Sequence, residues 1–181
     1  MAVFDSTFLV YLFDPDANPP NDPNTGNPVS HLKERIDHLV AEIERSKDKV
    51  VIPTPCLSEY LIKAADAGVD RLQFLQSKGV FQLAEFGTLA AVELAHMNRA
   101  AIESGDKKGG LEAPWQKIKL DRQIVAIAKV AGEGVIYSGD PQLHAFAAEA
   151  GIKAVRVDQL EIPPEAAQVD LGFPEDSDTG P

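Results

Sequence analysis

Short apolar runs rich in β-branched residues, separated by segments with helical periodicity, constrain the fold of this chain more than any other feature of its sequence. The runs 50–52 and 135–137 predict buried strands, and the segments 2–4, 80–86 and 154–157 are also strand-like. Strands that alternate with helices predict a parallel sheet covered on both faces. Because such crossovers are right-handed, the expected fold class is α/β, a three-layer α/β/α sandwich around a central parallel sheet.

Several of the predicted helices have recognisable starts. Ser30 is expected to cap a helix whose apolar positions run from Leu32 to Ile43. Thr54 is expected to cap the next, with Pro55 at its first position. A strongly apolar helix is expected over residues 120–131, ended by the glycines that follow it. The remaining predicted helices cover residues 8–13, 69–77, 89–102 and 141–150.

Two segments read as surface loops. Residues 14–30 are rich in Pro, Asn, Asp and Gly, a composition that disfavours a helix or a central strand. Residues 105–110 form a short polar stretch that contains glycine and lysine. The rest of residues 1–160 is expected to form a single domain.

The C-terminal segment 161–181 differs from this domain in composition. It carries six acidic residues, four prolines and no Lys or Arg, so we expect a disordered or loosely packed tail. The chain has a formal net charge of −11, and removing these six acids changes it to −5. An acidic surface repels phosphate backbones unless a basic patch or a bound metal reverses the field. Since over half of the net charge lies in the tail, this objection to nucleic-acid binding is weakened.

The sequence predicts a soluble, cytoplasmic protein. Its single cysteine, Cys56, allows no disulfide within the chain and is expected to be a small buried thiol. The first residues lack the basic region of a signal peptide. No apolar run approaches the roughly 20 residues needed to span a membrane.

Four acidic residues fall on segments next to the predicted strands. Asp5 and Asp140 come directly after two of them. Glu59 lies on the helix after the run 50–52, and Asp121 opens the helix that leads into the run 135–137. Because ligands of parallel sheets bind beyond the carboxyl ends of the strands, these acids are candidates for one site.

Each acid also has a purely structural explanation. Asp5 and Asp140 could simply cap the helices that follow them. Glu59 stands four residues before Lys63, a favourable pair on an exposed helix face. Asp121 is different, because it projects into the edge of an apolar stripe, where an ionised carboxylate needs a counter-charge, a metal or hydrogen bonds.

Together the four acids predict a divalent-metal site. Carboxylates gathered in one place raise each other's pKa, and a cation offsets that repulsion. Mg²⁺ and Mn²⁺ both prefer oxygen ligands, and either retains water that can serve as a nucleophile.

Four stretches of the sequence resemble the acidic motifs of PIN-domain nucleases, in the same order. The motifs are residues 3–10 (VFDSTFLV), 54–61 (TPCLSEYL), 120–128 (LDRQIVAIA) and 135–140 (VIYSGD). The resemblance covers about residues 1–160, and its closest subgroup is the VapC-type toxins of bacterial toxin–antitoxin pairs. The length of the segment 14–30 and the acidic tail depart from the family pattern.

The resemblance implies an α/β/α endoribonuclease that hydrolyses RNA phosphodiester bonds with Mg²⁺ or Mn²⁺ and leaves a 5′-phosphate. It also implies a protein antitoxin as partner and a homodimer. The implied metal-binding and catalytic residues are Asp5, Glu59, Asp121 and Asp140, with Ser138 supporting the site by hydrogen bonding and Ser6 as a small polar neighbour.

Basic residues before and around the third acidic motif are candidates for guiding the RNA backbone. They are Lys107, Lys108, Lys117, Lys119 and Arg122. The alternative is an exposed polar linker with no role in binding. Trp115 is interpreted as a packing anchor rather than a residue that stacks on a base.

Two other functions remain open from the sequence. The first is a module of the same fold that binds RNA or a protein partner without cleavage. The second is a metal-dependent phosphohydrolase of small molecules, whose aspartyl-phosphate version would need a second acid two residues after Asp5, where Thr7 stands.

Overall fold

A five-stranded, all-parallel sheet forms the centre of the protein in the computed structural model, which describes residues 1–108, 110, 112–132 and 134–167. The strand order is β3-β2-β1-β4-β5, so the first strand lies in the middle of the sheet. The strands are β1 (Ala2–Phe4), β2 (Val50–Pro53), β3 (Phe81–Ala84), β4 (Val135–Tyr137) and β5 (Ala154–Val155). The predicted parallel sheet is confirmed, although β3 and β5 are shorter than their predicted segments.

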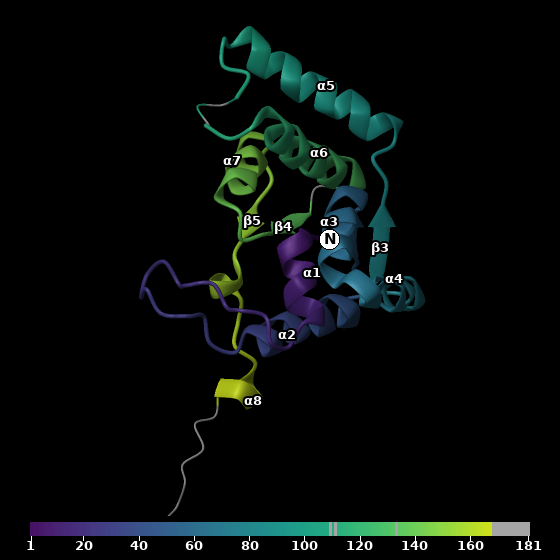
Figure 1. Cartoon of the computed structure of the whole chain (residues 1–181), viewed down its shortest axis with the longest axis vertical. Helices are drawn as coiled ribbons and strands as arrows, with labels where there is room; N and C mark the ends of the chain where they lie inside the picture. Colours follow the sequence, from purple (N-terminus) through teal and green to yellow (C-terminus); the bar gives the residue numbers. More distant parts are fainter. Residues whose placement is uncertain (109, 111, 133, 168–181) are drawn as a thin grey trace, which may run out of the picture.

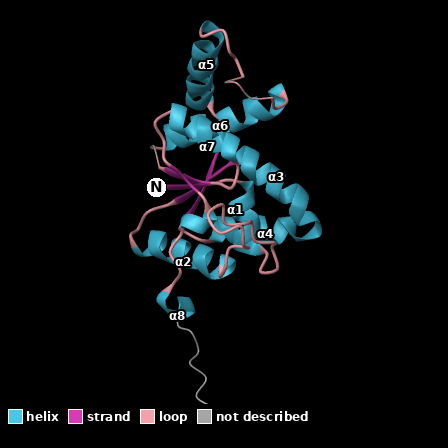
Figure 2. Cartoon of the chain, turned by 90° about the vertical axis from the view of Figure 1, so that its left-hand side faces the viewer, coloured by secondary structure: helices cyan, strands magenta, loops and turns pink. Residues whose placement is uncertain are grey.

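Helices cover both faces of this sheet, which confirms the three-layer arrangement (Figures 1 and 2). The helices are α1 (Ser6–Phe13), α2 (Leu32–Arg45), α3 (Thr54–Ala64), α4 (Gly68–Ser77), α5 (Thr88–Glu103), α6 (Trp115–Ala131), α7 (Pro141–Glu149) and α8 (Pro164–Ala167), with short 3-10 turns at Ala65–Ala67 and Val157–Gln159. Helices α1, α2 and α4 lie on one side, and α6 and α7 on the other, with α5 outside α6 (Figure 2).

Alternation along the central strands divides the core into two clusters. Phe4 and Ile52 face the cluster that includes α1 and α2, whereas Val3, Val51 and Ile136 face the cluster that includes α6 and α7. All five side chains are completely buried. Strands buried on both faces explain why their sequences are continuous apolar runs rather than alternating ones.

Three helix starts differ from the sequence prediction. Helix α2 is preceded by His31 in the left-handed conformation, with φ 55°, so Ser30 is not its cap. Pro53 is the N-cap of α3, so Thr54 is already helical. Helix α6 begins at Trp115, directly after Pro114, and not at Leu120. Asp121 therefore lies in the second turn of α6. The macrodipole stabilises a carboxylate mainly in the first turn, so it contributes little at Asp121.

The two segments with unusual composition have different outcomes. Residues 14–30 contain no helix or strand of the sheet and only an isolated bridge between Asn21 and Pro28, as predicted for a surface loop. Of the segment 161–181, residues 161–167 include the short helix α8, and the predicted disorder of residues 168–181 lies outside the described residues. No helix in the described part of the chain is long and apolar enough to cross a membrane.

The pairing of β1 with β4 predicts a strict requirement for glycine at position 134. A Cβ at Gly134 would lie 2.1 Å from the carbonyl oxygen of Met1, which accepts the Val135 N–H. We expect Gly134→Ala to lower the free energy of unfolding by about 1–3 kcal/mol, because the two strands must move apart. Gly79→Ala is the control, since no atom lies within 4 Å of its added Cβ. Equal stability of the two variants in urea denaturation would contradict this account.

Candidate functional site

The central pairing of β1 with β4 brings two of the predicted acidic motifs together. Phe4 pairs with Tyr137, so the residues that follow both strands emerge side by side. The Ser138 hydroxyl donates to Oδ2 of Asp5 and accepts the backbone N–H of Asp140 at 2.9 Å. Ser138 is completely buried, and its two hydrogen bonds join Asp5 to the backbone of Asp140.

Asp5 is both a helix cap and a buried acid. Its Oδ1 accepts the backbone N–H of Phe8 at 2.9 Å, which confirms the predicted cap of α1. Burial raises the pKa of Asp5 to about 6, against the opposing effect of the hydrogen bonds from Ser138 and Phe8, and the charge of Asp140 raises it further. Capping alone does not require such burial, so the carboxylate is available for a second role.

Asp121 is the least satisfied polar group of the site. Its residue is 6% exposed, and Oδ2 is a buried side-chain oxygen without a hydrogen-bond partner. The nearest opposite charge is the Lys117 ammonium, at 3.5 Å from this oxygen. Burial raises the pKa of Asp121 to about 6; Lys117 lowers it, while the charges of Asp140 and Glu59 raise it. The structure thus supports the prediction that this acid needs a counter-charge or a ligand.

Asp140 caps α7, as predicted. Its pKa lies below the ordinary value, whereas those of Asp5 and Asp121 are raised. Its Oδ1 accepts the Gln142 N–H at 2.8 Å, and its Oδ2 accepts a hydrogen bond from Lys117. Partial burial raises the pKa of Asp140, but the bond from Lys117 and the N–H of Gln142 outweigh it, so the net shift is downward. Asp140 is therefore ionised across the neutral pH range.

Glu59 and Ser6 lie at the margin of this cluster. Glu59 is half-buried on α3, and its charge raises the pKa of Asp121 and of the Cys56 thiol. Within the described ranges it forms no ion pair with Lys63, which leaves the exposed-pair explanation without support. Ser6 is buried, and its backbone N–H lowers the pKa of the buried Cys56 thiol, which burial raises overall.

Only part of a metal site is in place in this arrangement. The donors are all carboxylate oxygens, the ligands that Mg²⁺ and Mn²⁺ prefer, and the orphaned Oδ2 of Asp121 fits a cation ligand. In the part of the chain that the structure describes, however, no three His, Cys, Asp or Glu side chains are arranged to hold one ion. The cation between Asp121 and Asp140 is instead the ammonium of Lys117.

The predicted RNA-contacting residues have different environments. Lys107 and Lys119 are exposed, whereas Lys108 donates to the Ala113 carbonyl at 3.1 Å and Lys117 binds the acids. The Lys107 ammonium lies 5.1 Å from the centre of the half-buried Trp115 ring. Trp115 packs against the core, in line with its interpretation as an anchor.

Arg122 corrects a prediction. Its residue is 2% exposed, and its guanidinium donates to Asn98 and to the Lys107 carbonyl. The guanidinium also lies 4.8 Å from the centre of the Phe146 ring. A buried arginine that joins α5, α6 and α7 is not available to an RNA backbone, because its hydrogen bonds hold these elements together.

Two residues of the site were missed by sequence reasoning. Gln142 accepts a hydrogen bond from Lys117 at 3.1 Å, and the His144 ring nitrogen lies 2.8 Å from the Ser138 carbonyl oxygen. Both stand in the first turns of α7 after Asp140. Their position near a capping acid was the signal that could have identified them.

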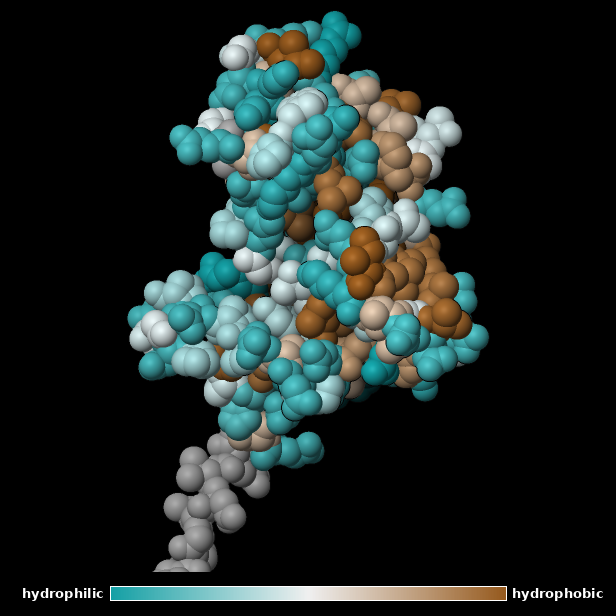
Figure 3. Space-filling view, viewed as in Figure 1, coloured by the Kyte–Doolittle hydropathy of each residue, from teal (hydrophilic) through white to brown (hydrophobic). Residues whose placement is uncertain are grey.

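Apolar side chains gather on the surface over α3 and α4 (Figure 3). Ile62 and Val69 are 78% and 66% exposed, and Phe74 is exposed beside them. A neighbouring pocket of about 330 Å³ includes Tyr60 and Arg71 in its lining. This apolar surface is a candidate contact for another protein.

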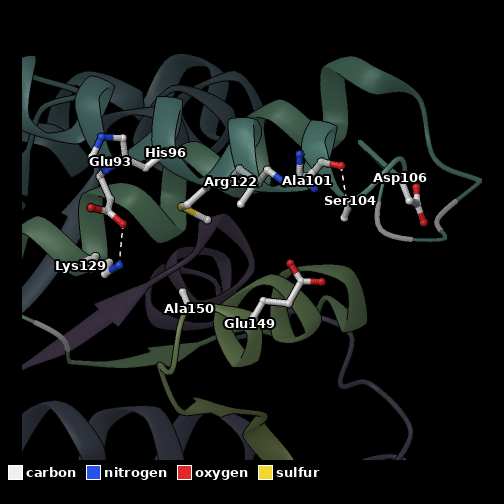
Figure 4. Close-up of a pocket in the computed structure, with 11 residues that line it drawn as sticks. Glu93, His96, Ala101, Ser104, Asp106, Arg122, Lys129, Glu149 and Ala150 are labelled. Atoms are coloured by element: carbon white, nitrogen blue, oxygen red, sulfur yellow. Dashed lines mark hydrogen bonds and ion pairs between the residues drawn. The ribbon is translucent and has the colours of Figure 1, made fainter.

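A cavity of about 500 Å³ lies between α5, α6 and α7 (Figure 4). Glu93 pairs with Lys129 across its wall, and Glu149 faces it from α7 (Figure 4). None of the four predicted metal-binding acids lines this cavity. The acids that follow β1 and β4 therefore lie outside this cavity.

The parallel sheet, its strand order and its flanking helices define a PIN-like α/β/α fold, and structural comparison supports this. One similar chain is in the crystal structure of VapBC2 from Rickettsia felis bound to a DNA fragment from their promoter. The two chains superpose with a TM-score of 0.53 and 8% sequence identity, over 86% of this chain and 97% of that chain. Another is in the structure of DNA-bound VapBC from Salmonella typhimurium: TM-score 0.50, 14% identity and the same coverage of both chains. Scans of the sequence against known families and curated proteins find no match.

The raised pKa of Asp121 predicts how stability depends on pH in metal-free buffer. Its folded pKa is about 6 against 3.8 for the ordinary carboxyl, so the folded state holds the extra proton between these values. Stability due to this group is therefore present at low pH and is lost as pH rises through about 6. We expect Asp121→Asn to be more stable than the natural protein at about pH 7.5, by roughly 1–2 kcal/mol, and no more stable at about pH 4.

The matched control for this prediction is Asp16→Asn, which makes the same charge change at an exposed loop position. Thermal denaturation of the three proteins across the pH range measures the effect. A constant difference between Asp121→Asn and the natural protein at all pH values would show that the carboxylate is not destabilised by burial.

Proposed function

We propose that this protein is a divalent-metal-dependent endoribonuclease that hydrolyses RNA phosphodiester bonds. The observation that carries the proposal is the buried Asp121, whose Oδ2 lacks a hydrogen bond beside Asp140 at the carboxyl end of the sheet. Ser138 hydrogen-bonds both the carboxylate of Asp5 and the backbone N–H of Asp140. Under this proposal Asp5, Asp121 and Asp140 hold Mg²⁺ or Mn²⁺, and Glu59 completes the ligand set.

The chain's own residues supply orientation and charge. Ser138 and the Phe8 N–H fix the carboxylate of Asp5, and the Gln142 N–H fixes that of Asp140. Bound Mg²⁺ or Mn²⁺ supplies an activated water and positive charge for the phosphoryl oxygens. Lys107 and Lys119 are proposed to attract the RNA backbone, since both residues are exposed.

We also propose that the protein is the toxin of a toxin–antitoxin pair and acts in the cytoplasm. Two solved complexes that contain a chain of similar fold are VapBC assemblies bound to DNA. The apolar surface over α3 and α4, with Ile62 and Val69, suits an antitoxin segment that buries hydrophobic side chains. A homodimer is part of the same proposal.

One observation favours a second function, a module of this fold that binds RNA or a partner without cleavage. Lys117 already neutralises Asp140, and no metal-binding group of three is preassembled among the described residues. A permanent ion pair at this position would leave no room for a metal. The same experiment decides between the two functions.

The deciding experiment is RNA cleavage with and without divalent metal. We expect structured RNA to be cut in Mg²⁺ or Mn²⁺ and to remain intact in EDTA. Asp5→Asn and Asp121→Asn should each lower the rate by at least roughly 100-fold, because each removes charge from the metal site. Asp16→Asn, at an exposed position, should cleave like the natural protein.

Equal rates for the natural protein and the two site variants would remove the proposed active site. RNA binding without cleavage in every metal would favour the binding module. Hydrolysis of a simple phosphate ester but not of RNA would instead identify a small-molecule phosphohydrolase.

A further inference from the structure

The position of Lys117 is not explained by its own helix. It lies in the first turn of α6, where the helix dipole disfavours a cation. Its partner Asp121 is four residues further along, and a lysine placed before its acid is the weaker order for such a pair. The contact that holds the ammonium in place therefore comes from another part of the chain, the Asp140 carboxylate at the start of α7.

The ammonium occupies the place that a cation would take between these acids. Its three oxygen neighbours come from two helices: Asp121 at 3.5 Å, Gln142 at 3.1 Å, and Asp140. The pKa of Lys117 is raised: burial lowers it, but the hydrogen bond and charge of Asp140 and the charge of Asp121 outweigh that effect. One positive charge satisfies Asp140 and leaves Oδ2 of Asp121 without a hydrogen bond.

Of Lys117, Asp121 and Asp140, Lys117 is the residue whose charged group can move away from the other two. Its side chain is 41% exposed, whereas that of Asp121 is 8% exposed. The ammonium is carried on a flexible four-carbon stem that can turn toward solvent. Asp140 is held in place by the N–H of Gln142, so the acids stay when the lysine moves.

We propose that Lys117 is the resident counter-ion of the acid cluster, and that a divalent cation binds there by displacing its ammonium from Asp121 and Asp140. This inference rests on the proposed metal-dependent function. It assigns Lys117 a positioning role in place of the RNA contact predicted from the sequence. The lysine keeps the acids together in the metal-free protein and competes with the metal for them.

The test compares Lys117→Met with Lys119→Met, which removes the same charge at an exposed position on the same helix. In EDTA we expect the melting temperature of Lys117→Met to fall by roughly 3–6 °C below that of Lys119→Met, because the acids lose their counter-ion. In saturating Mn²⁺ the two melting temperatures should converge.

Titration calorimetry with Mn²⁺ completes the thermodynamic cycle. The dissociation constant should be about tenfold smaller for Lys117→Met than for Lys119→Met, because the metal no longer has to displace the ammonium. Tenfold tighter binding corresponds to about 1.4 kcal/mol of stability lost by the metal-free variant. The two measurements must therefore agree in size.

Equal or weaker Mn²⁺ affinity in Lys117→Met would overturn the displacement, and so would a fall in melting temperature that persists in saturating Mn²⁺. If Lys117→Met unfolds in EDTA, Mn²⁺ must restore its fold, and Lys117→Gln must show the same pattern to a smaller degree; failure of either would overturn the proposal. A natural protein that neither binds Mn²⁺ nor cleaves RNA would instead overturn the proposed function, a result visible without any variant.

Discussion

Repulsion among carboxylates that are partly removed from water is the constraint on which the site depends. The pairing of β1 with β4 forces Asp5 and Asp140 to emerge next to each other, and α6 adds Asp121 from one face of the sheet. Burial makes each charge costly, and proximity adds to the cost. The hydrogen bond from Ser138 to Asp5 and the positive charge of Lys117 offset part of this cost. Hydrogen bonds thus stabilise Asp5, whereas Asp121 and Asp140 share the charge of Lys117.

Much of the fold and part of the site could be predicted because their signals are local. A continuous apolar run predicts a strand that is buried on both faces. An acid directly after such a run predicts a helix cap, and Asp5 and Asp140 are indeed the N-caps of α1 and α7. Asp121 was identified by its place at the edge of an apolar stripe, where an ionised carboxylate is costly unless it has a partner. These inferences depend only on neighbours within one or two turns of the chain.

The remaining features depend on contacts between distant segments. Lys117 and Arg122 look alike in sequence, yet one binds acids 4 and 23 residues away while the other is enclosed by α5 and α7. The apolar stripe predicts a start of α6 at Leu120, whereas the helix begins at Trp115, directly after its N-cap Pro114. Whether a basic side chain meets solvent, an acid or an aromatic ring is decided by tertiary packing.

The place of β1 in the middle of the sheet has a consequence for the order of assembly. The hydrogen bond between Ser138 and Asp5 joins residues 133 positions apart. During synthesis the first strand can pair with β2 early, but its other edge must wait until β4 has left the ribosome. Closing so long a loop is among the slow steps of folding, so the acids meet only after most of the chain has been made. A growing polypeptide thus carries Asp5 long before it carries Asp140, the acid that lies beside it in the folded protein.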